Sequence, residues 1–271
     1  MRITRRRALP RYTALLLAAL LLCSGCGKAP EAPEADPAAP VEAAAAESPA
    51  ESAEAGMTPA DADTAADGLL DEHWFDDALF LGDSLTGSLN IYNIQSGGLG
   101  DALIFHVNGL AVHHIVEKDT HFNFKGQSCS IDEAAALSGA GKLFLMLAMN
   151  DVGTRPIEQL HEDWAIMLAR IQERCPDMAI YVQSGTPLRL DVNYFTRENM
   201  ADYNDMLRAV CEETGCVYVD VTPGLADEDG YLKDEYRLDD LHLNPEGCTV
   251  WVENLRRAAS YSVPPAAEEH T

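Results

Sequence analysis

Ser84 stands at a turn between a predicted strand and a predicted helix, where a hydroxyl can act as a nucleophile. The run 78–81 is apolar throughout and leads into Gly82-Asp83-Ser84, and a helical segment, 85–92, follows at once. Short apolar runs are typical of strands buried on both faces of a parallel sheet, whose carboxyl ends bind ligands. The backbone N–H of Ser84 would lie at a helix N-terminus, which favours developing negative charge. Gly-Asp-Ser is also an ordinary turn tripeptide, so the stretch needs support from elsewhere.

Two further apolar runs end in residues that can donate hydrogen bonds. The run 102–107 is followed by Gly109, and the run 142–149 by Asn150. Because the carboxyl ends of parallel strands share one edge of a sheet, we expect both residues to approach Ser84. A glycine lets the backbone come close to an oxyanion, and an asparagine amide donates without carrying a titratable charge. Losing one such donor typically costs about 2.7–4 kcal/mol of transition-state stabilisation.

His242 and two adjacent carboxylates follow the fifth predicted strand, at the same edge of the sheet as Ser84. Asp239 and Asp240 precede the histidine by three and two positions. A serine hydroxyl is a weak nucleophile until a base takes its proton, and a carboxylate can hold the imidazole in the required tautomer. Taken singly, each of these residues also fits a surface or a loop. Their joint occurrence favours catalysis.

The elements around these residues predict an α/β fold. Strands separated by helices give a parallel sheet with helices on both faces, so we expect a three-layer α/β/α sandwich with a five-stranded sheet in flavodoxin-like order. The polar connection 117–130 is predicted to be a long loop, a feature that is often functional. The expected strands are 78–81, 102–107, 142–149, 178–183 and 216–221, and the expected helices are 70–77, 85–92, 110–116, 131–137, 156–174, 196–214 and 245–261.

Together these residues resemble the four sequence blocks of the SGNH (GDSL-type) hydrolase superfamily. The resemblance runs from about residue 78 to residue 251 and implies the SGNH hydrolase fold. It implies that Ser84 is the nucleophile, His242 the general base and Asp239 the carboxylate that orients it. It also implies an oxyanion hole made of the backbone N–H groups of Ser84 and Gly109 and the side-chain amide of Asn150. The matching residues are Leu81-Gly82-Asp83-Ser84-Leu85, Gly109, Asn150-Asp151 and Asp239-x-x-His242.

This chain departs from the family pattern at two positions. Ala148 stands where the third block usually begins with glycine, which adds a methyl group close to Asn150. Asp240 stands where related bacterial sequences often have glycine, so both Asp239 and Asp240 are candidates to orient the histidine. The motif spacing favours Asp239.

The resemblance implies a serine esterase that works through an acyl-Ser84 intermediate with no metal or organic cofactor. Family and location together suggest a small acyl group, most simply acetyl, on an extracytoplasmic carbohydrate or a similar small-molecule ester. Three alternatives stay open: a lipase or lysophospholipase, an O-acyltransferase that uses the same site, and a non-catalytic binding lipoprotein on the same scaffold. The natural ester and the oligomeric state are not specified by the sequence.

The N-terminal residues 1–26 have the pattern of an export signal. Five arginines precede the apolar run 14–22, and Ser24-Gly25-Cys26 resembles a bacterial lipoprotein box, in which Cys26 would be lipidated. The apolar run is too short to span a membrane. An uncleaved anchor or a plain signal peptide are the alternatives. In each case we expect the domain to be exported, as a cell-surface or periplasmic protein.

The rest of the chain is predicted to be one domain, 69–262, between an acidic tether, 27–68, and a short tail, 263–271. The tether is rich in Ala, Pro and Glu and cannot bury enough apolar surface to fold. The full chain has a formal net charge of −25, and removal of residues 1–26 takes away five arginines and no acid, which leaves −30. Such a charge disfavours nucleic acid and anionic membrane surfaces. Membrane attachment is therefore expected only through a lipid on Cys26.

The five cysteines after residue 26 form no Cys-x-x-Cys pair. Cys211 and Cys216 could close a small disulfide or stay as buried free thiols. The acidic stretch 227–230 lacks the spacing of a calcium loop and is predicted to be a solvated turn. No metal site is expected.

Overall fold

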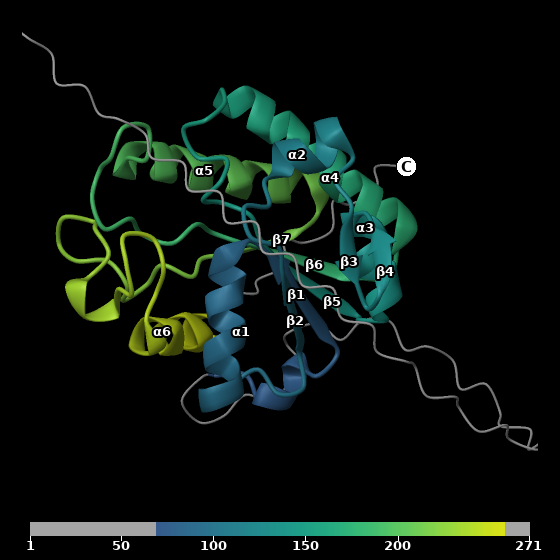
Figure 1. Cartoon of the computed structure of the whole chain (residues 1–271), viewed down its shortest axis with the longest axis horizontal. Coiled ribbons are helices and arrows are strands. Elements are labelled where there is room, and N and C mark those ends of the chain that lie inside the picture. Colours follow the sequence, from purple (N-terminus) through teal and green to yellow (C-terminus); the bar gives the residue numbers. More distant parts are fainter. Residues whose placement is uncertain (1–68, 258–271) are drawn as a thin grey trace, which may run out of the picture. The chain divides into compact units, whose positions relative to one another are not determined.

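The computed structural model describes residues 69–257, apart from the side chains of residues 93–96. A five-stranded parallel sheet lies at the centre, with the order β2-β1-β5-β6-β7 (Figure 1). Numbered along the chain, this order is 2-1-3-4-5, which confirms the flavodoxin-like prediction. The strands are β1 (Ala78–Gly82), β2 (Leu103–His106), β5 (Lys142–Met146), β6 (Ala179–Gln183) and β7 (Val217–Val219).

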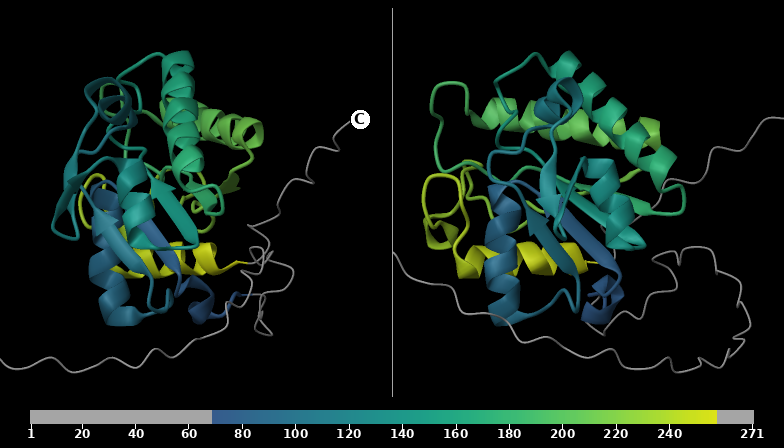
Figure 2. Two further views of the ribbon diagram at one scale, coloured as in Figure 1. Left: turned by 90° about the vertical axis from the view of Figure 1, so that its right-hand side faces the viewer. Right: turned by 45° about the vertical axis from the view of Figure 1, so that its right-hand side comes forward.

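Helices cover both faces of the sheet (Figures 1 and 2). Helices α1 and α6 contact each other on one face, while α2, α3 and α5 each contact α4 on the other. The three-layer prediction is therefore confirmed. The helices are α1 (Ser84–Ser96), α2 (Val112–Lys118), α3 (Ile131–Ser138), α4 (Ile157–Arg174), α5 (Arg197–Thr214) and α6 (Pro245–Arg256), with single 3₁₀ turns η2 (Glu72–Phe75) and η3 (Asp234–Tyr236).

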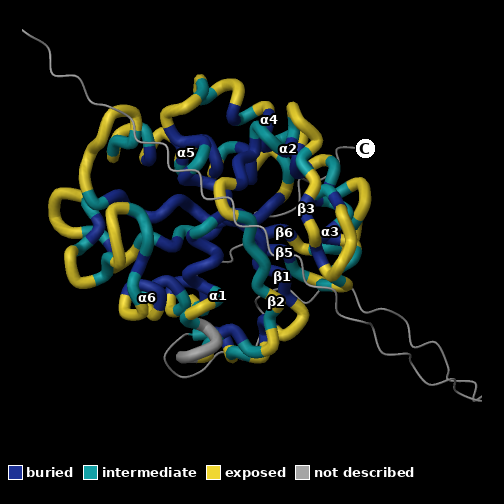
Figure 3. The backbone as a smooth tube through the Cα atoms, in the orientation of Figure 1, coloured by how far each residue is buried: buried dark blue, intermediate teal, exposed yellow. Residues whose placement is uncertain are grey.

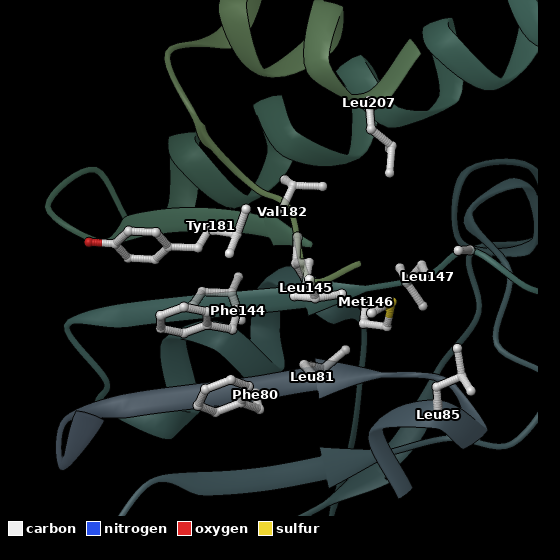
Figure 4. Packing of buried hydrophobic residues seen from close by; sticks show 14 of the residues in the cluster. Phe80, Leu81, Leu85, Phe144, Leu145, Met146, Leu147, Tyr181, Val182 and Leu207 are labelled. Atoms are coloured by element: carbon white, nitrogen blue, oxygen red, sulfur yellow. The ribbon is translucent and has the colours of Figure 1, made fainter. Parts of the chain in front are cut away.

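The central strands β1, β5 and β6 are buried along almost their whole length, as their apolar runs predict, whereas the edge strand β2 is partly exposed (Figure 3). Strand register aligns Phe80, Phe144 and Tyr181 across β1, β5 and β6. Their rings stack at centroid distances of 4.5 Å in both pairs, with interplanar angles of 13° and 11° (Figure 4). This aromatic row packs the three central strands against one another, and their parallel pairing brings the carboxyl ends to one edge.

The segment 117–130 is not the long loop that the sequence predicts. It folds into an antiparallel hairpin of β3 (Phe122–Phe124) and β4 (Gln127–Cys129). Lys125 and Gly126 form its turn, both with positive φ, which suits a two-residue hairpin. The prediction was wrong because the apolar alternation is only three residues long and Lys-Gly is a weaker turn signal than Asn-Gly.

Several element ends also differ from the prediction. The strand expected over 142–149 ends at Met146, because the chain turns away and the N–H groups of Asp151 and Val152 bond to Ala148 O. Helix α1 continues to Ser96, beyond the expected end at residue 92. The expected first helix is only a 3₁₀ turn.

Some predictions fall outside the described residues. These are the signal 1–26 with Cys26, the tether 27–68, the tail 263–271 and the domain's last residues, 258–262. Within residues 69–257, no helix combines the length and the apolar character that a bilayer crossing requires.

Candidate active site

Ser84, His242 and Asp239 form one hydrogen-bonded row. Ser84 Oγ lies 3.0 Å from His242 Nε2, and His242 Nδ1 lies 2.9 Å from Asp239 Oδ2. Because a carboxylate only accepts hydrogen bonds, the neutral imidazole carries its proton on Nδ1 and leaves Nε2 free to accept from the serine hydroxyl. The row is therefore set to withdraw a proton from Ser84.

Elements far apart in the sequence bring the first two members together. Ser84 is the first residue of α1, directly after β1, so its own backbone N–H is not used within the helix. His242 stands two residues before the cap of α6, where Asn244 Oδ1 accepts the Gly247 N–H at 2.9 Å. Since α1 and α6 contact each other, the starts of both helices converge at the sheet edge.

The structure separates the two adjacent carboxylates. Asp240 turns away and forms an ion pair with Arg189 at 2.6 Å. Asp239 Oδ1 accepts the backbone N–H groups of Leu241 and His242, both at 2.8 Å, while the carboxylate contacts the His242 ring. Of the two candidates, Asp239 is thus the one whose carboxylate contacts the imidazole.

The pKa of Asp239 reflects competing effects. Burial pushes this pKa upward, but the backbone N–H groups of His242 and Leu241 and the imidazole outweigh it, so the pKa lies below its ordinary value. Asp239 is therefore ionised well into the acidic range. An anionic partner at this distance would stabilise a positively charged imidazole.

Of the three predicted oxyanion donors, the Asn150 amide contacts residues that adjoin the other two. Asn150 Nδ2 donates to Leu110 O at 3.0 Å and to Asp83 Oδ2 at 3.3 Å. Asn150 is therefore bound on one side to the residue after Gly109 and on the other to the residue before Ser84. Gly109 has a φ of +73°, a conformation that glycine adopts without strain.

A model of the GDSL-like lipase/acylhydrolase family matches residues 80–250, a range that contains all of these residues. The chain belongs to this family. It is accordingly an ester hydrolase. No curated protein sequence matches the chain.

Solved structures share the GDSL fold at low sequence identity. A protein from Bacteroides fragilis described as an acylhydrolase is 13% identical, with a TM-score of 0.56, over 69% of this chain and 88% of its own. A GDSL-like lipase from Bacteroides thetaiotaomicron is 13% identical, with a TM-score of 0.54 over 67% and 86%. An acetyl xylan esterase is 12% identical, with a TM-score of 0.50 over 66% and 96%.

The departure from the GDSL pattern at Ala148 is accommodated by its surroundings. Ala148 is fully buried and faces Gly185, where an added Cβ would lie 3.0 Å from the Ala148 methyl and 2.4 Å from Met200 Sδ. The glycine opposite leaves the room that the methyl needs. Ala148 therefore does not exclude Asn150 from its place at the site.

Two buried carboxylates, Asp83 and Asp151, contact the site residues, and the sequence pattern assigned a role to neither. Asp83 is fully buried; Oδ1 accepts the Leu85 N–H at 2.9 Å, and Oδ2 faces the Asn150 amide. Burial raises the pKa of Asp83 to about 6, against the opposing bonds from the N–H groups of Leu85 and Met149. The signal for this residue was its place inside the Gly-Asp-Ser motif.

Asp151 is the second buried carboxylate. Its Oδ2 accepts the Val112 N–H at 2.8 Å, and its Oδ1 lies 2.6 Å from His113 Nδ1. It thereby ties the turn after Asn150 to the start of α2, just beyond Gly109. Both segments that carry predicted oxyanion donors are fixed to each other by this carboxylate.

Two other groups that the sequence singled out are the cysteine pair, Cys211 and Cys216, and the acidic turn 227–230. Cys211 and Cys216 are free and buried, and burial raises the pKa of both thiols. Asp227 Oδ1 closes the acidic turn by accepting the N–H groups of Asp229 and Tyr231 at 3.0 and 2.9 Å. Among residues 69–257, no group of three or more His, Cys, Asp or Glu residues is arranged to hold a metal ion.

Proposed function

We propose that the protein is an exported, lipid-anchored serine esterase that removes small acyl groups, above all acetyl, from carbohydrate outside the cytoplasm. The observation that carries the catalytic part is the hydrogen-bonded row of Ser84, His242 and Asp239, with distances of 3.0 and 2.9 Å between successive partners. Export and lipidation are inferred from the pattern of residues 1–26 and Cys26.

The reaction follows from this row in two steps. His242 Nε2 takes the hydroxyl proton as Ser84 Oγ attacks the ester carbonyl, and the resulting oxyanion accepts hydrogen bonds from nearby donors. Collapse breaks the ester bond, and His242 returns the proton to the leaving alcohol. Water, activated by the same imidazole, then attacks the acyl-Ser84 ester and releases the acid, which restores the serine.

The openness of the site supports a short acyl group. The Asp239 side chain is 55% exposed and the His242 side chain 27% exposed, so the row lies near the surface. A long acyl chain gains binding energy only where apolar walls remove it from water. An acetyl xylan esterase with the same fold supports the carbohydrate part of the proposal.

A fluorophosphonate probe tests whether the serine is activated. We expect the wild type to be labelled covalently and Ser84→Ala to remain unlabelled, with hydrolysis of p-nitrophenyl acetate lost in parallel. His242→Ala should also abolish labelling, because the base is gone. A wild type that resists the probe would favour a non-catalytic binding protein on the same scaffold.

A series of p-nitrophenyl esters tests the acyl length. We expect kcat/KM to be highest for acetate and to fall as the chain lengthens, because the partly exposed His242 and Asp239 place the reacting carbonyl near the surface. Activity that rises beyond about eight carbons, a length at which apolar burial dominates binding, would identify a lipase instead. Product analysis with an added sugar acceptor separates hydrolysis from acyl transfer, since a transferase would yield the acylated sugar.

A further inference from the structure

Asp83 occupies a position that connects the predicted nucleophile to a predicted oxyanion donor. It precedes Ser84 in the chain, and its side chain is fully buried. One carboxylate oxygen accepts the N–H of Leu85, the residue that follows the serine, at 2.9 Å. The other faces Asn150 Nδ2 at 3.3 Å. A single carboxylate therefore contacts both the turn that carries Ser84 and the amide across the site.

The Asn150 amide has no freedom to rotate without losing a partner. One of its two hydrogens serves Leu110 O at 3.0 Å, a bond of ordinary length. The other points to Asp83 across 3.3 Å, which is long for such a bond and leaves the hydrogen available to be shared. A second acceptor that approaches from the serine, such as an oxyanion, can take up this hydrogen without a side-chain movement.

The position of Asp83 is itself fixed by hydrogen bonds of its backbone. Its backbone N–H donates to Met146 O at the end of β5, at 3.1 Å, and its backbone oxygen accepts the Gly87 N–H within α1. Leu85, which it caps, belongs to the same buried cluster as Met146 and Leu147 (Figure 4). Groups held by packing on rigid elements keep their geometry when the substrate changes.

We propose that Asp83 is a positioning residue that fixes the Asn150 amide between Leu110 O and the turn at Ser84, so that the amide donates to the oxyanion. This inference rests on the proposed function of Ser84. Asp83 does not touch the substrate; it acts through Asn150. Its loss would leave the amide free to rotate away, and the transition state would lose a donor although binding of the ester would hardly change.

A double-mutant cycle with p-nitrophenyl acetate tests this role. The first variant is Asp83→Ser, because a serine at this place can still accept the Leu85 N–H but is too short to reach Asn150. We expect kcat to fall about tenfold to a hundredfold with KM nearly unchanged, the pattern of a lost transition-state interaction. Asn150→Ala should lower kcat by roughly 10²–10³. In that background, Asp83→Ser should change kcat by less than about twofold.

Controls separate positioning from general damage. Asp163→Asn removes another buried carboxylate, which lies on α4 at 3.7 Å from Arg155 and outside the site, and it should leave kcat unchanged. Asp83→Asn is the second variant for the cycle, to be used if Asp83→Ser folds poorly. It keeps the volume of the original side chain. Thermal unfolding of every variant shows which of them are folded at the assay temperature.

The outcomes are distinct. A loss of kcat from Asp83→Ser that disappears when Asn150 is alanine supports the proposal. An equal loss in both backgrounds, or no loss in the first, overturns it and makes Asp83 a residue of the scaffold. Full activity of Ser84→Ala would instead overturn the proposed function, whatever the cycle gives.

Discussion

Asp239 holds His242 at two places at once. Its Oδ1 accepts the backbone N–H of His242 at 2.8 Å, and its Oδ2 lies 2.9 Å from Nδ1 of the same residue. The carboxylate thus fixes both the backbone of His242 and the orientation of its ring. Because the two residues are only three positions apart, a local turn is enough to bring the carboxylate to both groups.

This double contact predicts a difference between two adjacent substitutions. Asp239→Asn should lower kcat by up to roughly 10⁴-fold, because an amide can donate to Nδ1 and so favour the wrong tautomer of the imidazole. Asp240→Asn should leave kcat within about twofold of the wild type, because Asp240 pairs with Arg189 and not with the imidazole. Steady-state kinetics on p-nitrophenyl acetate measures both, and a larger loss from Asp240→Asn would contradict the assignment.

Gly109 and Gly139 make a matched pair of substitutions. Both have a φ of +73°, and an added Cβ would meet no atom within 4 Å at either position. Each change to alanine should therefore cost about 1–2 kcal/mol in the free energy of unfolding, from the left-handed backbone alone. Only Gly109→Ala should also lower kcat, because its peptide adjoins the predicted oxyanion hole. Urea unfolding and steady-state kinetics measure both effects on both variants. Equal losses of kcat would show that Gly109 has no special role at the site.

Gly82→Ala should lower both the stability and the activity of the protein. A Cβ at this position would lie 2.3 Å from Met146 O, a backbone atom of the neighbouring strand that cannot move aside. Overpacking of this kind costs typically about 1–3 kcal/mol and shifts the backbone. We expect a lower melting temperature and loss of activity together, because the shifted strand end carries Ser84. A variant with wild-type stability would contradict this close packing of Gly82 against Met146.

Asp83 should make stability depend on pH in a definite direction. Its folded pKa is about 6, above the ordinary value of 3.8, so between these values the folded protein keeps a proton that the unfolded chain has released. The contribution of Asp83 to the free energy of unfolding is therefore highest at low pH and falls as pH rises through this window. Across this window the free energy of unfolding falls by about 3 kcal/mol in total, because the folded pKa lies about two pH units above the ordinary value.

The matched comparison for this effect is Asp83→Asn, which cannot titrate. We expect the difference in unfolding free energy, wild type minus variant, to decrease steadily from pH 4 to pH 7, since all other carboxyls contribute equally to both proteins. Urea titrations at four pH values measure it. A constant difference across the range would show that Asp83 has the same pKa in both states.

The sequence predicted the sheet and the site because its signals were local and mutually consistent. Each strand of the main sheet is a short apolar run, and Ser84, Gly109 and Asn150 each follow one of them. The hairpin at Lys125 and Gly126 was missed for the opposite reason: its strands are three residues long, and packing of the phenylalanines against the domain, not local periodicity, holds them in place.

What the sequence alone determined is the set of reactive residue types and their order, together with a strand pattern that places Ser84 and Asn150 on one edge of the sheet. The tertiary structure decided which neighbour each of them contacts. It turned Asp239 towards the imidazole and Asp240 towards Arg189, and it buried Asp83 against the Asn150 amide. Arg189 lies 51 residues from Asp240, and Asn150 lies 67 residues from Asp83, so local spacing in the sequence does not specify these contacts.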